Sequence, residues 1–149
     1  MVIHFGTDHA GFALKEEVLA YVRDTLGYEV VDHGAYALDP TDDYPAYMYM
    51  AVRAMAENGQ DARAILFGGS GQGEAMVANR IPGIRATVYY GGQPEIIRLS
   101  REHNDANVLS FGARFVSVEE TKEMVALWLN TPFTEDERHI RRIAQIDTL

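Results

Sequence analysis

Residues 68–74 combine a ligand-binding loop with a possible acid or base, because the run GGSGQG is followed directly by Glu74. Glycine lets the backbone approach a ligand closely, at a cost of about 1 kcal/mol for each glycine placed in a helix. Between a strand and a helix, such a loop directs several backbone N–H groups at one point, where they can hold a phosphate or a developing oxyanion. A tight turn without a ligand is the alternative, but four glycines exceed what a turn needs.

Glu74 has two possible roles at the start of the helix that follows this loop. A carboxylate in the first turn can simply complement the helix dipole, which stabilises a helix by roughly 0.3–1 kcal/mol. It can also act as a general base facing the glycine-lined pocket, if partial desolvation raises its pKa against the opposing effect of the helix terminus. The residues alone leave both roles open.

Three further polar groups accompany the loop. Asp8 and His9 follow the first apolar run and precede Ala-Gly, which favours a ligand-facing pair over a structural histidine. Arg138 and Arg142 share a helix face and suit a phosphate, although acidic neighbours could pair with them instead. Residues 101–105 (REHND) end a predicted helix, where cationic side chains also complement the dipole.

Several kinds of site are excluded. The glycine spacing in residues 69–75 departs from the dinucleotide fingerprint, and Phe12 stands where a phosphate-binding Walker loop requires lysine. The chain has no cysteine, and its five histidines show no metal-ligand spacing. We therefore expect no metal site and no thiol catalysis.

Short apolar runs alternate with amphipathic segments, and this alternation predicts the elements that position these residues. It is typical of a Rossmann-like three-layer α/β/α sandwich around a five-stranded parallel sheet, whose ligands bind beyond the carboxyl ends of the strands. The predicted strands are Val2–Thr7, Tyr28–Asp32, Ala64–Phe67, Arg85–Tyr89 and Val108–Phe111. The predicted helices are Phe12–Leu26, Pro45–Asn58, a segment after Gly73, Ile96–Glu102, Glu119–Leu129 and Thr134–Gln145.

The length of 149 residues predicts one domain spanning residues 1–149. A formal net charge of −9 argues against binding to nucleic acid or to an anionic membrane. No apolar run is long enough to cross a membrane, and the amino terminus lacks the pattern of a signal peptide. We expect a cytoplasmic protein.

Taken together in their order along the chain, the motifs resemble the ribose-5-phosphate isomerase B family, which includes the galactose-6-phosphate isomerase subunits. The resemblance covers nearly the whole chain. The matching segments are 6–15 (GTDHAGFALK), 43–45 (DYP), the glycine loop with 78–80 (ANR), 83–86 (GIRA), 101–107 (REHNDAN), 112–114 (GAR) and 138–143 (RHIRRI).

This resemblance implies an aldose–ketose isomerisation of a sugar phosphate through an enediolate, without metal or organic cofactor. It gives ring opening to His103, support of proton movement to Asp8, and contact with the enediolate oxygen to Ser70 and the loop amides. The implied catalytic residues are Glu74, His103, Ser70 and Asp8. The implied substrate contacts are His9, Tyr44, Gly69, Gly71, Gly73, Asn104, Arg114, Arg138 and Arg142.

One departure from the family concerns the base. Many members carry a cysteine at the position of Gly68, whereas one branch has Gly-Gly-Ser-Gly-x-Gly-Glu and uses that glutamate, which favours Glu74 as the base here. Members are dimers or tetramers with sites shared between subunits, so the last helix would serve a neighbouring pocket. We expect ribose 5-phosphate and ribulose 5-phosphate as substrates. A tetrose or hexose phosphate, or a non-catalytic sugar-phosphate or nucleotide sensor, is the alternative.

Overall fold

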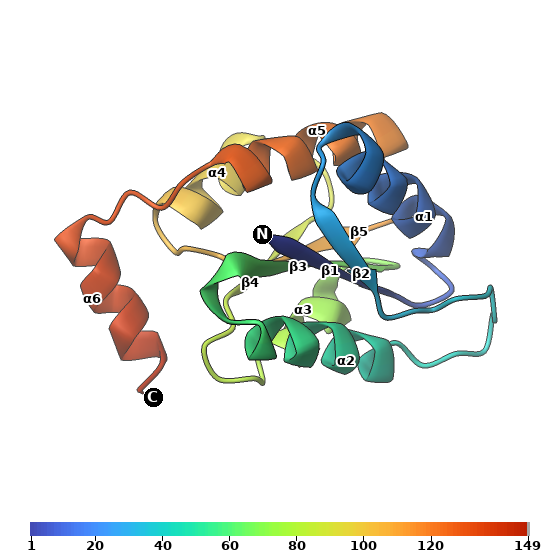
Figure 1. Ribbon diagram of the computed structural model, residues 1–149, viewed down its shortest axis with the longest axis horizontal. Helices are drawn as coiled ribbons and strands as arrows, with labels where there is room; N and C mark the ends of the chain where they lie inside the picture. The colour runs from blue at the N-terminus through green and yellow to red at the C-terminus, as the bar shows by residue number, and fades with distance from the viewer. Residues whose placement is uncertain (149) are drawn as a thin grey trace.

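Short runs rich in β-branched and aromatic residues form a parallel sheet of five strands in the order β2-β1-β3-β5-β4 (Figure 1). The computed structural model describes residues 1–148. All five predicted strands and the parallel sheet are confirmed, with ends that differ by at most two residues. The strands are β1 (Val2–Thr7), β2 (Glu29–Asp32), β3 (Ala62–Gly68), β4 (Ala86–Tyr89) and β5 (Val108–Gly112).

Within residues 1–148, six α-helices connect and follow the strands. The first is shorter than predicted, because it gives way at Tyr21 to a π-helical turn, and the last begins at Glu137 instead of Thr134. Glu135 adopts a left-handed backbone conformation with φ of 58°, which no α-helix contains, so the helix starts beyond it. The backbone N–H and hydroxyl of Thr134 both donate to the carbonyl of Glu102. The helices are α1 (Phe12–Ala20), α2 (Tyr44–Glu57), α3 (Gln72–Ala78), α4 (Glu95–Glu102), α5 (Val118–Asn130) and α6 (Glu137–Ile146), with the turns η1 (Tyr21–Thr25) and η2 (Gly59–Asp61).

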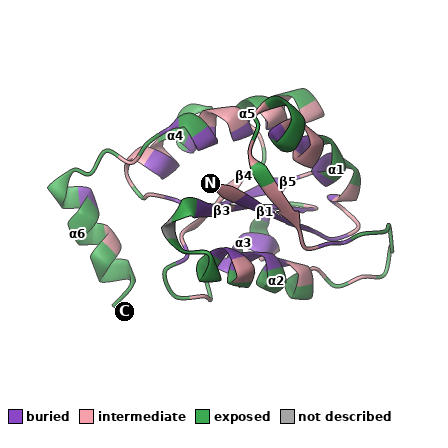
Figure 2. Cartoon of the chain, viewed as in Figure 1, coloured by how far each residue is buried: buried purple, intermediate pink, exposed green. Residues whose placement is uncertain are grey.

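The helices cover both faces of the sheet, as predicted. α1, α4 and α5 lie on one face, and α2 and α3 lie on the other (Figure 1). Alternate residues of β1 serve the two layers: Ile3 and Phe5 pack into the core beneath α1 and α5, whereas Gly6 faces α2. A Cβ at Gly6 would lie 3.1 Å from the Cβ of Ala51, so glycine permits the close approach of this helix. Figure 2 shows the resulting buried centre between exposed outer surfaces.

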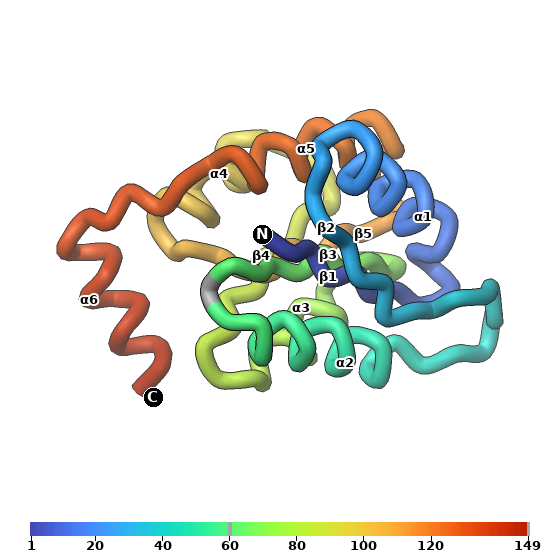
Figure 3. Tube along the Cα trace, in the orientation of Figure 1, coloured from blue at the N-terminus to red at the C-terminus, as the bar shows by residue number. Residues whose placement is uncertain are grey.

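Two segments extend from opposite ends of the sheet (Figure 3). The connection between β2 and α2, residues 33–43, lies at the carboxyl ends of the strands. α6 stands apart from the sheet, beyond the carboxyl end of α4, and most of its surface is exposed (Figure 2). None of the helices within residues 1–148 combines the length and the apolarity needed to cross a bilayer.

Candidate functional site

A pocket of about 390 Å³ opens at the carboxyl ends of β1 and β3, where the sequence places the glycine loop and the Asp8-His9 pair. Parallel strands direct their following loops to one edge of the sheet, which brings these two segments together. The pocket is lined by Asp8, His9, Ala10, Tyr44, Gly69, Ser70, Gly73, Glu74, Arg114 and Phe115.

Glu74 is the buried acid of this pocket. It lies in the first turn of α3 and its side chain is only 4% exposed. Burial raises the pKa of Glu74 above its ordinary value, and the negative charge of Asp8 raises it further, while its own backbone N–H opposes both effects. Burial therefore raises the pKa of Glu74 more than the N–H group at the helix terminus lowers it. The sequence had left open which of these two effects is larger.

The glycine loop, three residues of which line the pocket with Glu74, carries free backbone donors. Gly71 adopts a left-handed conformation with φ of 76°, and its carbonyl accepts a hydrogen bond from Ser110 Oγ at 2.8 Å. The backbone N–H of Ala113 donates to the carbonyl of Gly68, which fixes the start of the loop against β5. None of the hydrogen bonds within residues 1–148 uses the backbone N–H of Ser70 or Gly71. These N–H groups can donate to an anionic oxygen.

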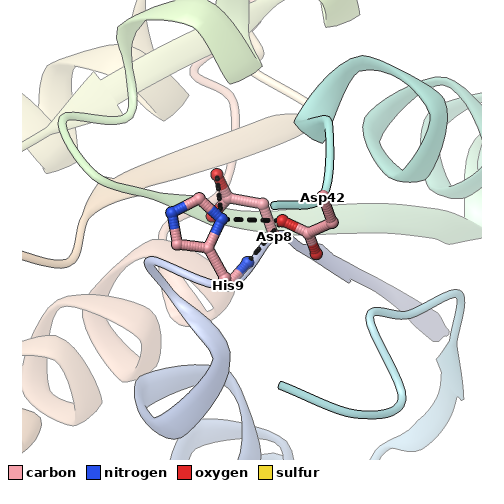
Figure 4. A group of neighbouring side chains, drawn as sticks. All are labelled: Asp8, His9 and Asp42. Carbon is pink, nitrogen blue, oxygen red and sulfur yellow. Dashed lines mark hydrogen bonds and ion pairs between the residues drawn. The ribbon is translucent and has the colours of Figure 1, made fainter. Parts of the chain in front are cut away.

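Asp8 and His9 meet a third polar residue, Asp42, from the loop before α2 (Figure 4). Asp8 Oδ1 accepts a bond from the backbone N–H of Ala10, which holds its carboxylate at the end of β1. His9 Nδ1 donates to Asp42 Oδ1 at 2.7 Å and lies 3.9 Å from Asp8 Oδ2. The bond to Asp42 raises the pKa of His9 more than burial lowers it.

The same three residues have ligand atoms within 4.8 Å of one another, a spacing that a divalent cation could bridge. The short bond from His9 Nδ1 to Asp42 Oδ1, which raises the pKa of His9 above its ordinary value, favours the protonated ring. An imidazolium has no free lone pair to donate to a metal. We therefore interpret the cluster as a hydrogen-bonded group that presents a cationic donor to the pocket.

Tyr44 and Arg114 enclose the glycine loop from two sides. A Cβ at Gly73 would lie 2.6 Å from the hydroxyl oxygen of Tyr44, and one at Gly69 would lie 3.2 Å from Cζ of Arg114. Both glycines therefore allow a side chain from another element to contact the loop. Arg114 also lowers the pKa of His9 by its charge, so two cationic groups face the same part of the pocket.

Four other predicted site residues lie away from this pocket within one chain. His103 and Asn104 follow α4 and precede the amino end of β5. The five residues of β5, at ~3.3 Å each, separate that end from the pocket by ~15 Å. Arg138 and Arg142 are exposed on α6. His103 stacks on His139 of α6, with ring centroids 4.3 Å apart, which joins these residues into a separate group.

A second hollow, of about 490 Å³, lies at the amino ends of the strands and contains Arg63, Arg85 and Arg101. These arginines are already occupied: Arg63 donates to carbonyls at the end of α5, and the other two bind Asp105. All three cationic side chains of this hollow are therefore bound to other groups of the protein.

Sequence reasoning missed Ala10, Phe115 and Asp42. Ala10 and Phe115 adjoin matched motifs and could have been found as neighbours of His9 and Arg114. Asp42 gave only a weak signal, its place in the long irregular stretch of residues 34–44, because an acidic residue in a polar loop is ordinary and its partner His9 is 33 residues away.

Comparison with known proteins identifies similar chains over the full fold. A family model described as Ribose/Galactose Isomerase matches residues 3–146. Ribose-5-phosphate isomerase B of Escherichia coli is 41% identical over 147 residues, covering 99% of this chain and 95% of the relative.

Two solved structures have nearly the same fold as this chain. The ribose 5-phosphate isomerase of Thermotoga maritima has a TM-score of 0.90 and 40% identity, covering 99% of this chain and 98% of the other. The ribose-5-phosphate isomerase B of Mycoplasma genitalium with bound ribulose-5-phosphate has a TM-score of 0.92 and 32% identity, covering 99% and 94%.

Proposed function

The chain belongs to the ribose/galactose isomerase family, and from this premise we propose that it interconverts ribose 5-phosphate and ribulose 5-phosphate. This aldose–ketose isomerisation moves a proton between C2 and C1 of the open-chain sugar. The observation that carries the proposal is the buried carboxylate of Glu74 in one pocket with the glycine loop, whose Ser70 and Gly71 N–H groups have no partner within residues 1–148. A base next to oxyanion donors is what an enediolate intermediate requires.

In this reaction Glu74 is the base. Its ionised carboxylate removes the proton from C2 of the aldose, and the electron pair moves into an enediolate. Because the pKa of Glu74 is raised, its carboxylate is a stronger base and retains the proton as a carboxylic acid. The acid then returns this proton to C1. The loop amides and the Ser70 hydroxyl stabilise the negative oxygen during this transfer.

The isomerisation also moves a proton between the hydroxyl oxygens on C1 and C2, and this transfer needs a second acid–base group. Asp8 lies close enough to raise the pKa of Glu74, and its buried carboxylate can support proton movement between the two sugar oxygens. Opening of the furanose ring requires a further acid or base, which is the role of His103. Asn104 binds the sugar chain near the reacting end, and Tyr44 lines the pocket for the sugar.

The phosphate of the substrate binds to cationic side chains. His9 and Arg114 provide two of them in the pocket of one chain. Arg138, Arg142, His103 and Asn104 lie too far from that pocket to serve it, so a second copy of the chain supplies them. The enzyme is accordingly a homodimer or homotetramer with sites shared between subunits.

The extent of the family match, residues 3–146, supports one isomerase domain for the chain. The reaction moves only protons, and the groups named above can accept and donate all of them without a metal or organic cofactor. A phosphorylated sugar is charged and does not cross a bilayer unaided, which agrees with a cytoplasmic enzyme.

Turnover measured side by side on four-, five- and six-carbon aldose phosphates tests this function. We expect the highest kcat/KM for ribose 5-phosphate, and activity that survives prolonged chelation. Preference for a tetrose or hexose phosphate would change the substrate and keep the reaction. Phosphate binding without turnover of any of the three would show a sensor instead of an enzyme.

A further inference from the structure

The side chain of Asp42 forms hydrogen bonds with a single residue, His9, among the described residues. Its Oδ1 accepts from the backbone N–H of His9 at 3.1 Å and from His9 Nδ1 at 2.7 Å. Its Oδ2 is buried and has no hydrogen-bond partner among the described residues, and the Asp42 side chain is only 6% exposed. Burying a carboxylate oxygen that has no hydrogen-bond partner costs free energy. The two hydrogen bonds with His9 are the contacts that offset this cost.

These contacts fix a proton on Nδ1 and the direction of the His9 ring. A carboxylate can only accept, so Nδ1 must carry the proton in this arrangement. The other ring nitrogen, Nε2, points away from both carboxylates (Figure 4). Because His9 lines the pocket and 31% of its side chain is exposed, this second nitrogen is available to an anionic ligand.

Charges from several elements act on this ring. Asp42 and Asp39 approach from the loop before α2, and Asp8 lies beside His9 after β1. Arg114, which follows β5, opposes them. Asp42 is the one among these that bonds directly to the ring, so its loss removes both a hydrogen bond and a negative charge.

We propose that Asp42 is a positioning residue: it holds His9 as an imidazolium whose Nε2–H points at the phosphate of the sugar substrate. The proposal rests on the proposed isomerase function. It deepens that function by naming the group that keeps His9 cationic and oriented. Without Asp42, His9 loses its charge at a lower pH, and phosphate affinity falls in the range where the native ring is still protonated.

The test compares wild-type with Asp42→Asn, which keeps the shape and an acceptor oxygen but removes the charge. Asp39→Asn is the matched control, because it removes a charge from the same loop without touching His9. Three quantities are measured from about pH 6 to about pH 8. They are KM and kcat for ribose 5-phosphate, the inhibition constant of inorganic phosphate, and the NMR titration midpoint of the His9 ring, assigned by its loss in His9→Gln.

We expect Asp42→Asn to lower the His9 midpoint and, between the variant and wild-type midpoints, to raise KM and the phosphate inhibition constant roughly three- to tenfold. The value of kcat should change less than twofold, since a phosphate contact acts in ground and transition states alike. Below both midpoints the ring is protonated in both proteins, so the ratio of variant to wild-type KM approaches one. Substrate phosphate ionises identically for both proteins and cancels in that ratio.

The possible failures are distinct. A working isomerase in which Asp42→Asn leaves the His9 midpoint and the pH dependence of KM unchanged would overturn the role of Asp42 alone. A lower melting temperature with an unchanged His9 midpoint would show that Asp42 only stabilises its loop. A wild-type protein that isomerises none of the sugar phosphates would overturn the proposed function, and with it the inference that rests on it.

Discussion

The carboxylate of Glu74 occupies the space in which a side chain at Gly68 would lie. A Cβ at Gly68 would collide with Oε1 and Cδ of Glu74 and would lie 2.8 Å from its Cγ. Gly68 ends β3 and Glu74 lies in the first turn of α3, so two positions six residues apart converge on one volume. A thiol at position 68 and the carboxylate of Glu74 are therefore alternative occupants, which gives a steric reason for the absence of cysteine there.

The first prediction tests this packing. Gly68→Ala should lower the free energy of unfolding by roughly 1–3 kcal/mol, because it overpacks a filled site, and should lower kcat by displacing the base. In a Glu74→Ala background the same change should cost much less, since the colliding atoms are gone. Urea denaturation of the wild-type, both single variants and the double variant measures this coupling. Equal penalties in both backgrounds would contradict the shared volume.

The second prediction concerns the base. Glu74→Gln should lower kcat by roughly 10²–10⁴-fold, because the amide cannot accept a proton, while KM changes only a few-fold. Steady-state kinetics measure kcat and KM, and the exchange of deuterium at C2 measures proton removal directly. Glu119→Gln is the matched control, since it makes the same change in the first turn of α5 at an exposed site. Near wild-type exchange in Glu74→Gln would assign the base to another residue.

The third prediction is a pH dependence. Burial raises the pKa of Glu74 above its ordinary value of 4.5, and the base works only when ionised. The acid limb of kcat/KM should therefore fall at a pH above that value, with activity lost as pH decreases through it. Asp8→Asn removes a like charge, so the limb should move to lower pH even if its height falls. A shift of the acid limb of kcat/KM to higher pH in Asp8→Asn would show that Asp8 does not raise the pKa of Glu74 by charge repulsion.

The fourth prediction is subunit complementation. Glu74→Gln and His103→Asn should each be nearly inactive alone. If each site combines Glu74 of one chain with His103 of another, unfolding and refolding a mixture forms dimers with one intact site. Random pairing then restores about a quarter of wild-type activity. Refolding each variant separately is the control, and a mixture that stays inactive would place both groups in one chain.

The amino-acid pattern determined the sheet and its loops. Val2–Thr7 forms a strand with the predicted ends, because a buried parallel strand is a continuous run of residues suited to an extended backbone. The glycine loop and the Asp8-His9 pair could likewise be assigned to one edge. That assignment needs only the direction of parallel strands, which follows from the alternation of strands and helices.

Only the tertiary structure decided which distant groups touch. Asp42 reaches His9 across 33 residues, and Thr134, which precedes the last helix, binds the carbonyl of Glu102. His103, by contrast, lies at the far edge from Glu74. Periodicity reports which face of its own element a residue occupies. Burial, pairing and pKa depend on strand order and on the path of the connecting loops, which bring together side chains that no local pattern relates.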